Sequence, residues 1–229
     1  MTRPLLLGHR GVRLRGLSRL SSRLPGENSL AAFEFALASG CDGFEFDVRH
    51  TCDGQNVLWH DPDLCGKTIA DSKYSQLHDR GGNTLPVLED VLAQFGKRAF
   101  LDIELKATGG EAAVLASLHE TGLHSKVLAS SFLPDVLYAM KRLNAGLSLG
   151  FLCDQKATLA HWREMPVGVV LPQDRLITKA LIAEVHEDGR QIMAWTVNAA
   201  ARMGQLARWG IDGLISDDPR LLYQTFHSR

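Results

Sequence analysis

Hydrophobic and polar positions alternate in two different ways along nearly all of the 229-residue chain. Short runs rich in aliphatic and β-branched residues are followed by longer stretches in which apolar residues recur at helical spacing. The predicted strands span residues 5–9, 43–49, 99–105, 127–131, 148–152, 168–171, 191–196 and 213–216. The predicted helices span residues 29–39, 88–95, 110–121, 134–142, 158–164, 178–188, 199–209 and 219–226.

This alternation predicts an α/β protein in which parallel strands are joined by helices. Eight strands, each followed by a helix, favour a (β/α)8 TIM barrel as one catalytic domain over residues 1–229, and an open doubly wound sheet is the alternative. Asn28 precedes the first helix and is a candidate cap. Four helices are followed by a glycine that can adopt the left-handed conformation of a helix end, namely Gly40, Gly122, Gly189 and Gly210.

Two segments do not fit the alternation of predicted strands and helices. Residues 61–86 are a polar connection, which predicts a small insertion after strand two. Residues 11–26 form an arginine-rich loop that leaves the barrel after strand one. Its arginines are Arg13, Arg15, Arg19 and Arg23, and its leucines Leu14, Leu17, Leu20 and Leu24 follow at spacings of three and four. The loop is interpreted either as a mobile lid over the barrel mouth or as a solvated loop on its rim.

The amino-acid composition limits the functions that the chain can have. With 45% hydrophobic and 22% charged residues the chain can form a substantial core. The formal net charge of −1 favours neither nucleic acid nor an anionic membrane as a partner. The apolar run at the amino terminus is too short for a signal peptide, and no stretch approaches the roughly 20 residues of a membrane-spanning helix. The four cysteines lack metal-binding spacing, so we expect buried free thiols and a cytoplasmic protein.

Charged residues alternate with apolar residues along two of the predicted strands. Because side chains alternate between the two faces of a strand, Glu45 and Asp47 share one face of strand two. Asp102, Glu104 and Lys106 share one face of strand three in the same way. The apolar partners of these residues pack outward on the helices in a barrel, so we expect all five ionisable groups to point inward and to lie together at the barrel mouth. Crowded carboxylates are costly to ionise without a cation, and oxygen ligands favour Mg²⁺ or Ca²⁺. A structural network of charges is the alternative.

Two histidines are placed to join this acidic group. His9 ends strand one, and His60 follows a short apolar run soon after strand two. Active sites of these barrels lie on the loops at the carboxyl ends of the strands, where we expect both histidines.

The ordered motifs of the chain resemble those of the glycerophosphodiester phosphodiesterases. The similarity covers nearly the whole sequence and begins with Gly8-His9-Arg10-Gly11 and Glu27-Asn28-Ser29. It continues with Phe44-Glu45-Phe46-Asp47, Trp59-His60-Asp61, Ile103-Glu104-Leu105-Lys106, Ala194-Trp195-Thr196-Val197-Asn198 and Ile215-Ser216-Asp217. The chain departs from the family at residues 11–26, which are inserted, and at Gly26, which separates Pro25 from Glu27.

The resemblance implies a role for each matching residue. Glu45, Asp47 and Glu104 would be ligands of a divalent metal, and His9 and His60 would be the acid–base pair. Arg10 and Lys106 would hold the phosphate, Glu27 would lie near the metal or Arg10, and Trp195 would line the substrate pocket.

The reaction implied by the family is metal-dependent hydrolysis of a small glycerophosphodiester to sn-glycerol 3-phosphate and an alcohol. Either water or the neighbouring glycerol hydroxyl could attack the phosphorus. A lysophospholipase D or sphingomyelinase D-like enzyme with lipid substrates is the alternative. A Schiff-base aldolase using Lys106 is disfavoured, because flanking carboxylates raise a lysine pKa. A non-catalytic binding barrel is the remaining alternative. Headgroup, metal identity and oligomeric state stay open.

Overall fold

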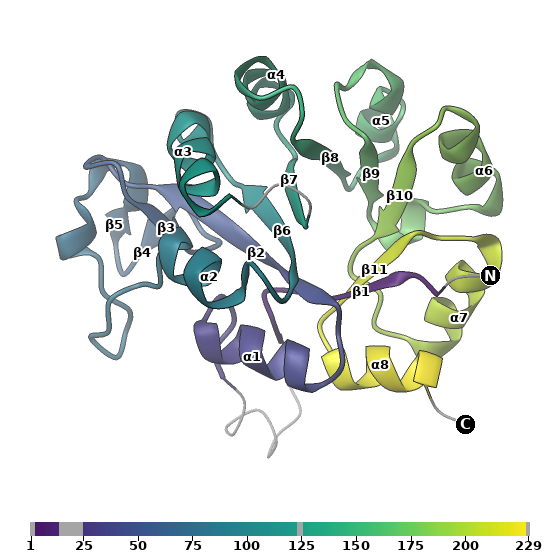
Figure 1. The fold of residues 1–229 in the computed structure, drawn as a ribbon, viewed down its shortest axis with the longest axis horizontal. Helices are drawn as coiled ribbons and strands as arrows, with labels where there is room; N and C mark the ends of the chain where they lie inside the picture. Colours follow the sequence, from purple (N-terminus) through teal and green to yellow (C-terminus); the bar gives the residue numbers. More distant parts are fainter. Residues whose placement is uncertain (1–2, 14–24, 123–125, 228–229) are drawn as a thin grey trace.

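The computed structural model describes residues 3–13, 25–122 and 126–227. Its central sheet has nine strands, of which only β3 is antiparallel to its neighbour. The other strands run parallel and close into a barrel, because β1 pairs with both β11 and β2 (Figure 1). Closure confirms the predicted barrel and rules out the open doubly wound sheet. The barrel strands are β1 (Leu5–Gly8), β2 (Gly43–His50), β6 (Phe100–Leu105), β7 (Val127–Ser131), β8 (Ser148–Cys153), β9 (Val169–Pro172), β10 (Gln191–Ala194) and β11 (Gly213–Ser216).

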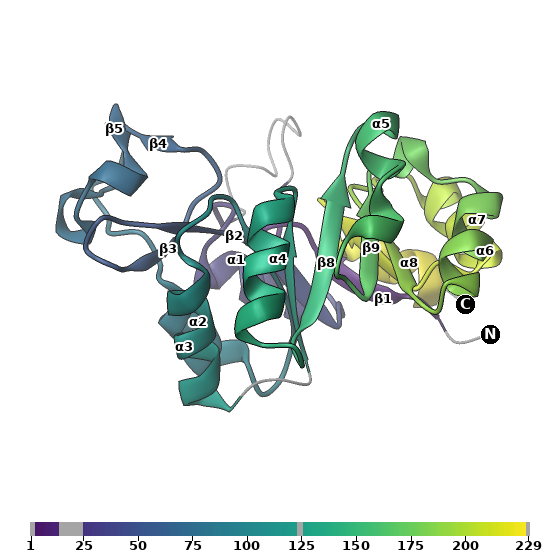
Figure 2. The ribbon, with the colours of Figure 1, turned by 90° about the horizontal axis from the view of Figure 1, so that it is seen from above.

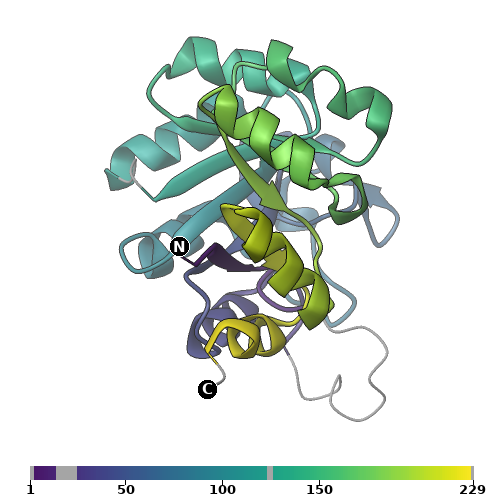
Figure 3. The same cartoon turned by 90° about the vertical axis from the view of Figure 1, so that its right-hand side faces the viewer.

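Helices surround the barrel, and α1 and α8 pack side by side next to the chain termini (Figure 3). The helices are α1 (Leu30–Ala38), α2 (Leu88–Phe95), α3 (Glu111–Thr121), α4 (Pro134–Leu143), α5 (Lys156–Leu159), α6 (Lys179–Glu187), α7 (Ala200–Trp209) and α8 (Pro219–His227). Gly40, Gly122, Gly189 and Gly210 all have positive φ, so the predicted helix ends are confirmed. None of the helices in the described ranges is long and apolar enough to cross a membrane.

One predicted helix is wrong in extent. Residues 158–164 were expected to form a single helix, but the structure has the short α5 followed by a 3-10 turn at Trp162–Glu164. Trp162 is buried, and the Arg190 guanidinium lies 5.2 Å from the centroid of its ring. Arg190 Nη1 also donates hydrogen bonds to the carbonyls of Trp162 and Met165. These contacts satisfy carbonyl groups that a continuous helix would have used itself.

Apolar side chains fill two regions of the barrel. The larger core lies between the strands and the helices and includes Phe44, Phe46, Leu101 and Ile103, as the alternation predicted. A smaller cluster fills the barrel interior, and its buried members come from β1 and from β7 through β11. They are Leu7, Leu128, Leu152, Val169, Leu171, Met193 and Ile215. The inner faces of β2 and β6 carry carboxylates instead, so the interior is divided into an apolar and a charged half.

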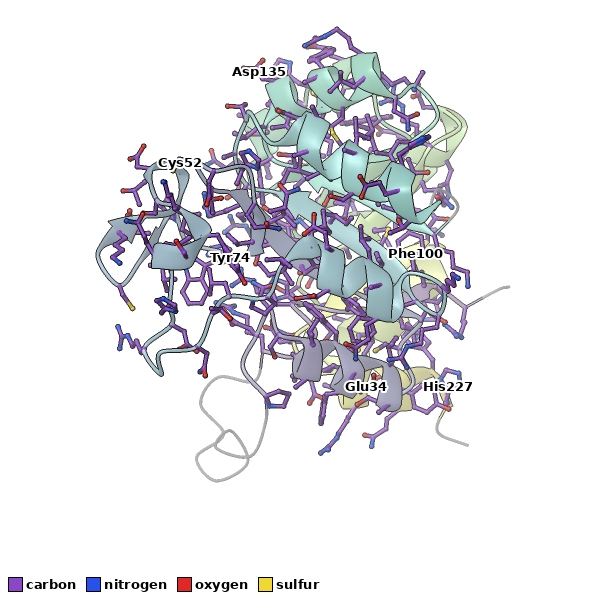
Figure 4. All side chains as sticks on the ribbon, turned by 60° about the vertical axis from the view of Figure 1, so that its left-hand side comes forward. Glu34, Cys52, Tyr74, Phe100, Asp135 and His227 are labelled. Carbon is purple, nitrogen blue, oxygen red and sulfur yellow. The ribbon has the colours of Figure 1, made fainter. Side chains whose placement is uncertain are left out.

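The insertion after β2 forms a small lobe at one side of the barrel (Figure 2). It contains β3 (Asn56–Leu58) and the hairpin of β4 (Asp63–Leu64) and β5 (Lys67–Thr68). The lobe has its own buried cluster, which includes Ile69, Leu77 and Leu85. Cys52 and Tyr74 mark the lobe in Figure 4, where the Tyr74 hydroxyl donates to the carbonyl of Leu85. The polar segment predicted from sequence is therefore a packed unit rather than an open loop.

Most of the arginine-rich loop lies outside the described residues. The lid expectation for Arg15, Arg19 and Arg23, with their neighbouring leucines, falls in residues 14–24 and stays a prediction. Arg13 is described, and its backbone N–H donates to the carbonyl of Asp217.

Candidate active site

Three carboxylates meet at one end of the charged half of the barrel. Glu45 and Asp47 project from β2, and Glu104 projects from β6, whose register places Glu104 beside Asp47. Each offers an oxygen, and these oxygens all lie within 4.8 Å of one another. All three side chains are buried. The structure thus brings together the residues that the resemblance assigned to a metal.

The electrostatics of this cluster suit a bound cation. Burial, followed by the charges of Asp47 and Glu104, raises the pKa of Glu45 well above its usual value. Burial also raises the pKa of Glu104 to about 7, although the nearby Lys106 lowers it. Among the described residues, no donor makes an aligned hydrogen bond to Glu45 Oε1 or Asp47 Oδ1. Buried oxygens of this kind are costly unless a partner satisfies them. An all-oxygen set fits a hard divalent cation.

Asp47 is the member of the cluster that stays ionised most readily. Burial raises its pKa, but the charges of Lys106 and Arg10 and a hydrogen bond from Asn28 outweigh burial, so the pKa lies below its usual value. Asn28 Nδ2 donates to Asp47 Oδ2 at 2.7 Å, and Asn28 Oδ1 accepts from the Asp47 backbone N–H. Ser29, not Asn28, caps α1 by accepting a hydrogen bond from Ala32. The predicted cap is therefore wrong, because the amide of Asn28 holds Asp47 instead.

Two cations lie beside these carboxylates and line the same cavity as Glu45 and Glu104. Lys106 Nζ hydrogen-bonds to Glu104 Oε1 and lies 3.3 Å from Asp47 Oδ1. The Arg10 backbone N–H donates to Glu45 Oε2, and Arg10 Nε lies 3.0 Å from Asp47 Oδ2. Arg10 adopts a left-handed conformation with a φ of 49°, which turns both its backbone and its side chain toward the acidic cluster. Both cations are therefore held where an anion beside a metal could contact them.

Glu27 lies next to Arg10 rather than in the carboxylate cluster. Arg10 Nη1 donates to Glu27 Oε1 at 2.9 Å, and Arg13 Nε donates to Glu27 Oε2 at 2.7 Å. The resemblance left open whether Glu27 lies near the metal or near Arg10, and the structure favours Arg10. Arg13, which sequence reasoning placed only in the loop, lines the same cavity as Arg10.

His9 is oriented by a chain of hydrogen bonds from the last barrel strand. Its Nδ1 lies 2.6 Å from Asp217 Oδ1, and Asp217 Oδ2 accepts from Asn198 Nδ2 at 2.7 Å. Burial raises the pKa of Asp217, but its hydrogen bond with His9 and the charge of His9 hold the pKa below the usual value. His9 Nε2 lies 3.8 Å from Glu45 Oε2. Sequence reasoning quoted Asp217 and Asn198 only as parts of motifs and assigned them no role.

His60 reaches the same cavity from the insertion. The strand β3 runs back antiparallel along β2 and returns the chain to the barrel mouth. His60 Nδ1 lies 2.6 Å from Asp61 Oδ1, and Arg49 donates from Nε and Nη2 to the His60 carbonyl. Burial lowers the pKa of His60 below its usual 6.5, and the hydrogen bond with Asp61 offsets only part of this shift.

The titration of His60 provides a test of this geometry. In the metal-free protein we expect NMR to show the His60 ring titrating below pH 6.5, because burial disfavours the imidazolium. Asp61→Asn should lower the midpoint further, since the carboxylate favours the charged ring. Asp63→Asn, which alters an exposed carboxylate bonded to Thr68, should leave the midpoint in place. A midpoint that rises in Asp61→Asn would contradict the proposed pairing.

The charged and apolar halves of the barrel meet in a cavity of about 300 Å³. His9, Arg10, Glu45, His60, Glu104 and Lys106 line one part of it, and Asp47 lies fully buried behind them. Trp195 lines the other part, with its ring edge-on to Phe132 at 5.4 Å between centroids. Trp195 Nε1 donates to the Leu171 carbonyl, which fixes the ring. Asp102 was expected at the mouth, but it does not line the cavity and instead accepts a hydrogen bond from Ser130.

Gly8 supports the turn that carries His9 and Arg10. A Cβ at this position would lie 2.1 Å from the Gly11 carbonyl oxygen and 2.8 Å from Ala36 Cβ. We expect Gly8→Ala to reduce the free energy of unfolding by about 1–3 kcal/mol, because overpacking displaces the turn. Urea unfolding measures this change. The control Gly204→Ala, within α7, meets nothing closer than Arg208 at 3.4 Å and should stabilise the helix. Equal losses in both variants would contradict the packing argument.

The chain is similar to known phosphodiesterases in both sequence and fold. The sequence pattern of the glycerophosphoryl diester phosphodiesterase family matches residues 9–221. A glycerophosphodiester phosphodiesterase from Caldanaerobacter subterraneus is 28% identical, with 96% of each chain covered. The fold is similar to a putative glycerophosphoryl diester phosphodiesterase structure from Silicibacter pomeroyi, with a TM-score of 0.83, 21% identity and coverage of 98% and 93%. An Oleispira antarctica phosphodiesterase in complex with its product sn-glycerol-3-phosphate aligns with a TM-score of 0.79, 23% identity and coverage of 99% and 98%.

Proposed function

Because the chain belongs to the glycerophosphoryl diester phosphodiesterase family, we propose that it hydrolyses glycerophosphodiesters to sn-glycerol 3-phosphate and an alcohol. One observation carries the proposal for this chain. Three carboxylates have oxygens within 4.8 Å of one another, and two of them, Glu45 and Glu104, line a cavity together with two histidines. Each histidine is paired with a carboxylate of its own. The domain proposed for this reaction is the whole of residues 1–229. The product bound to the Oleispira antarctica relative supports the same reaction here.

Glu45, Asp47 and Glu104 are proposed to hold one divalent cation, Mg²⁺ or Ca²⁺. Such a cation would neutralise charge on a non-bridging phosphate oxygen. Arg10 and Lys106 hold the remaining oxygens as preorganised cations, since carboxylates on both sides fix their positions. Glu27 holds Arg10 in place through an ion pair with its Nη1.

The two histidines transfer protons at Nε2. In each ring Nδ1 is engaged by a carboxylate, Asp217 for His9 and Asp61 for His60, so Nε2 is the atom left to face the cavity. One histidine removes a proton from the nucleophile, and the other protonates the departing alkoxide. A pKa of His60 below 6.5 keeps this ring neutral at neutral pH, which suits it to accept a proton.

The proposal is tested by turnover of glycerophosphocholine, lysophosphatidylcholine and bis(p-nitrophenyl) phosphate, each with Mg²⁺, Ca²⁺ or EDTA. We expect glycerophosphocholine to be hydrolysed with a metal present and to release sn-glycerol 3-phosphate. Preferred cleavage of lysophosphatidylcholine would favour the lipid phosphodiesterase, for which the apolar wall of the cavity is the supporting observation. Absence of turnover for every diester would contradict both functions.

The compartment proposed for this reaction is the cytoplasm. All four cysteines are free thiols, namely Cys41, Cys52, Cys65 and Cys153. Cys41 and Cys153 are buried, but Cys52 and Cys65 are exposed, so the expectation that the thiols are buried is wrong for these two. Exposed thiols persist most readily where the environment is reducing.

A further inference from the structure

The cavity contains one amide whose hydrogen-bonding groups are not used. Gln173 directly follows β9 and lines the cavity. Within residues 3–13, 25–122 and 126–227 no group hydrogen-bonds to its side chain, and Gln173 Oε1 is buried. Its backbone is nevertheless fixed, because its N–H donates to Cys153 and the residue forms a parallel bridge with Trp195. An amide that is carried by a fixed backbone and has a buried oxygen without a partner is suited to bind a ligand group.

The position of Gln173 decides which part of a substrate it would meet. In the closed order of barrel strands, β9 lies opposite β2, and β10 lies opposite β6. Gln173 and Trp195 therefore face the carboxylates and Lys106 across the barrel. The lining residues around them are uncharged, namely Phe132, Leu152, Thr196 and Ile215. A phosphate held by the metal side would direct a neutral organic group, rather than a charged headgroup, toward this wall.

We propose that Gln173 is a specificity-determining residue that recognises the terminal hydroxyl of the glycerol moiety, so that the cavity selects diesters of free glycerol over acylated lysolipids. This inference rests on the proposed function. An amide offers both a donor and an acceptor, and a hydroxyl matches both. The terminal hydroxyl is the glycerol group farthest from the phosphate, so it is the glycerol group that a phosphate held on the metal side would direct toward the opposite wall. Acylation of that hydroxyl removes its donor and leaves the Gln173 carbonyl oxygen without a partner.

The test compares two substrates that differ in one hydroxyl. Glycerophosphocholine is compared with 2-hydroxypropyl phosphocholine, which lacks only the terminal hydroxyl and keeps the hydroxyl beside the phosphate ester. We expect the wild-type kcat/KM to be about tenfold higher for glycerophosphocholine. Gln173→Met, which keeps the length of the side chain without its amide, should lower kcat/KM about tenfold for glycerophosphocholine alone. The two substrates should then be turned over at similar rates.

The control variant is Gln191→Met, at the amino end of β10 and exposed away from the cavity. It should retain the wild-type preference. If the wild-type protein had similar kcat/KM values for the two substrates, the inference would be overturned before any variant was made. An equal loss of kcat/KM on both substrates in Gln173→Met would also overturn it. In both cases hydrolysis itself would persist, and the proposed function would stand. If the wild-type protein hydrolysed neither substrate, the proposed function would fail together with the inference.

Discussion

Chelation of divalent metal with EDTA is expected to abolish hydrolysis, and added Mg²⁺ or Ca²⁺ should restore it. The reason is electrostatic, because the buried carboxylates of Glu45, Asp47 and Glu104 repel one another unless a cation lies between them. In addition, Glu45 Oε1 and Asp47 Oδ1 have no aligned hydrogen-bond donor among the described residues, and a bound cation would satisfy both oxygens. Glu45→Gln keeps the shape of the side chain but removes a charged ligand. We expect it to lower kcat by at least about 10²-fold and to weaken metal binding measured by calorimetry.

The same variant should not unfold the protein. Burial and neighbouring carboxylates raise the pKa of Glu45, so its charge destabilises the metal-free fold, and Gln at this position removes that repulsion. The Tm of the metal-free Glu45→Gln variant should therefore be no lower than that of the metal-free wild type. The control is Glu34→Gln on α1, which alters an exposed ion pair between Glu34 and Arg98. It should change neither activity nor metal affinity. Full activity in excess chelator would refute the metal assignment.

The strands and the inner carboxylates could be predicted because the alternation of side chains is a local property. Phe44 and Phe46 pack outward and Glu45 and Asp47 point inward, as a period of two requires. Asp102 obeys the same alternation, yet it lies outside the cavity. The alternation predicts the face of the strand on which a side chain lies. How deep in the barrel that side chain lies depends on the register between neighbouring strands, which cannot be predicted from the alternation.

The groups that orient the histidines could not be predicted in the same way. His9 and Asp217 are 208 positions apart and meet only because β11 pairs with β1 to close the barrel. Asn28 was mistaken for a cap because a polar residue before a helix usually serves that purpose. Its amide instead binds Asp47, a tertiary contact that overrides the local preference. No role for Gln173 could be predicted from the sequence, because an amide is known to lack hydrogen-bond partners only when its surroundings in the fold are known.

Replacing either histidine with alanine should reduce kcat by at least about 10²-fold, which is typical of general acid–base groups. In each ring a carboxylate engages Nδ1, so the variant removes a proton carrier that is already oriented toward the cavity. The affinity for Mg²⁺ should barely change, because the oxygen cluster is complete without a histidine. His161→Ala is the control, since this histidine is exposed and pairs with the nearby Glu164.

His9 offers the sharper test of the two, because its Nε2 lies 3.8 Å from Glu45 Oε2 and is thus close enough for a small shift to make it a ligand. An acid–base role predicts that His9→Ala loses kcat while its calorimetric titration with Mg²⁺ matches the wild type. A role as ligand predicts that metal affinity and kcat fall together. Asp217→Asn separates the roles further, because it removes the carboxylate that orients the His9 ring and leaves the oxygen cluster intact, so an acid–base role predicts a loss of kcat at unchanged metal affinity. Loss of metal binding in His9→Ala would place this histidine among the ligands and leave His60 as the only general acid–base group of the pair.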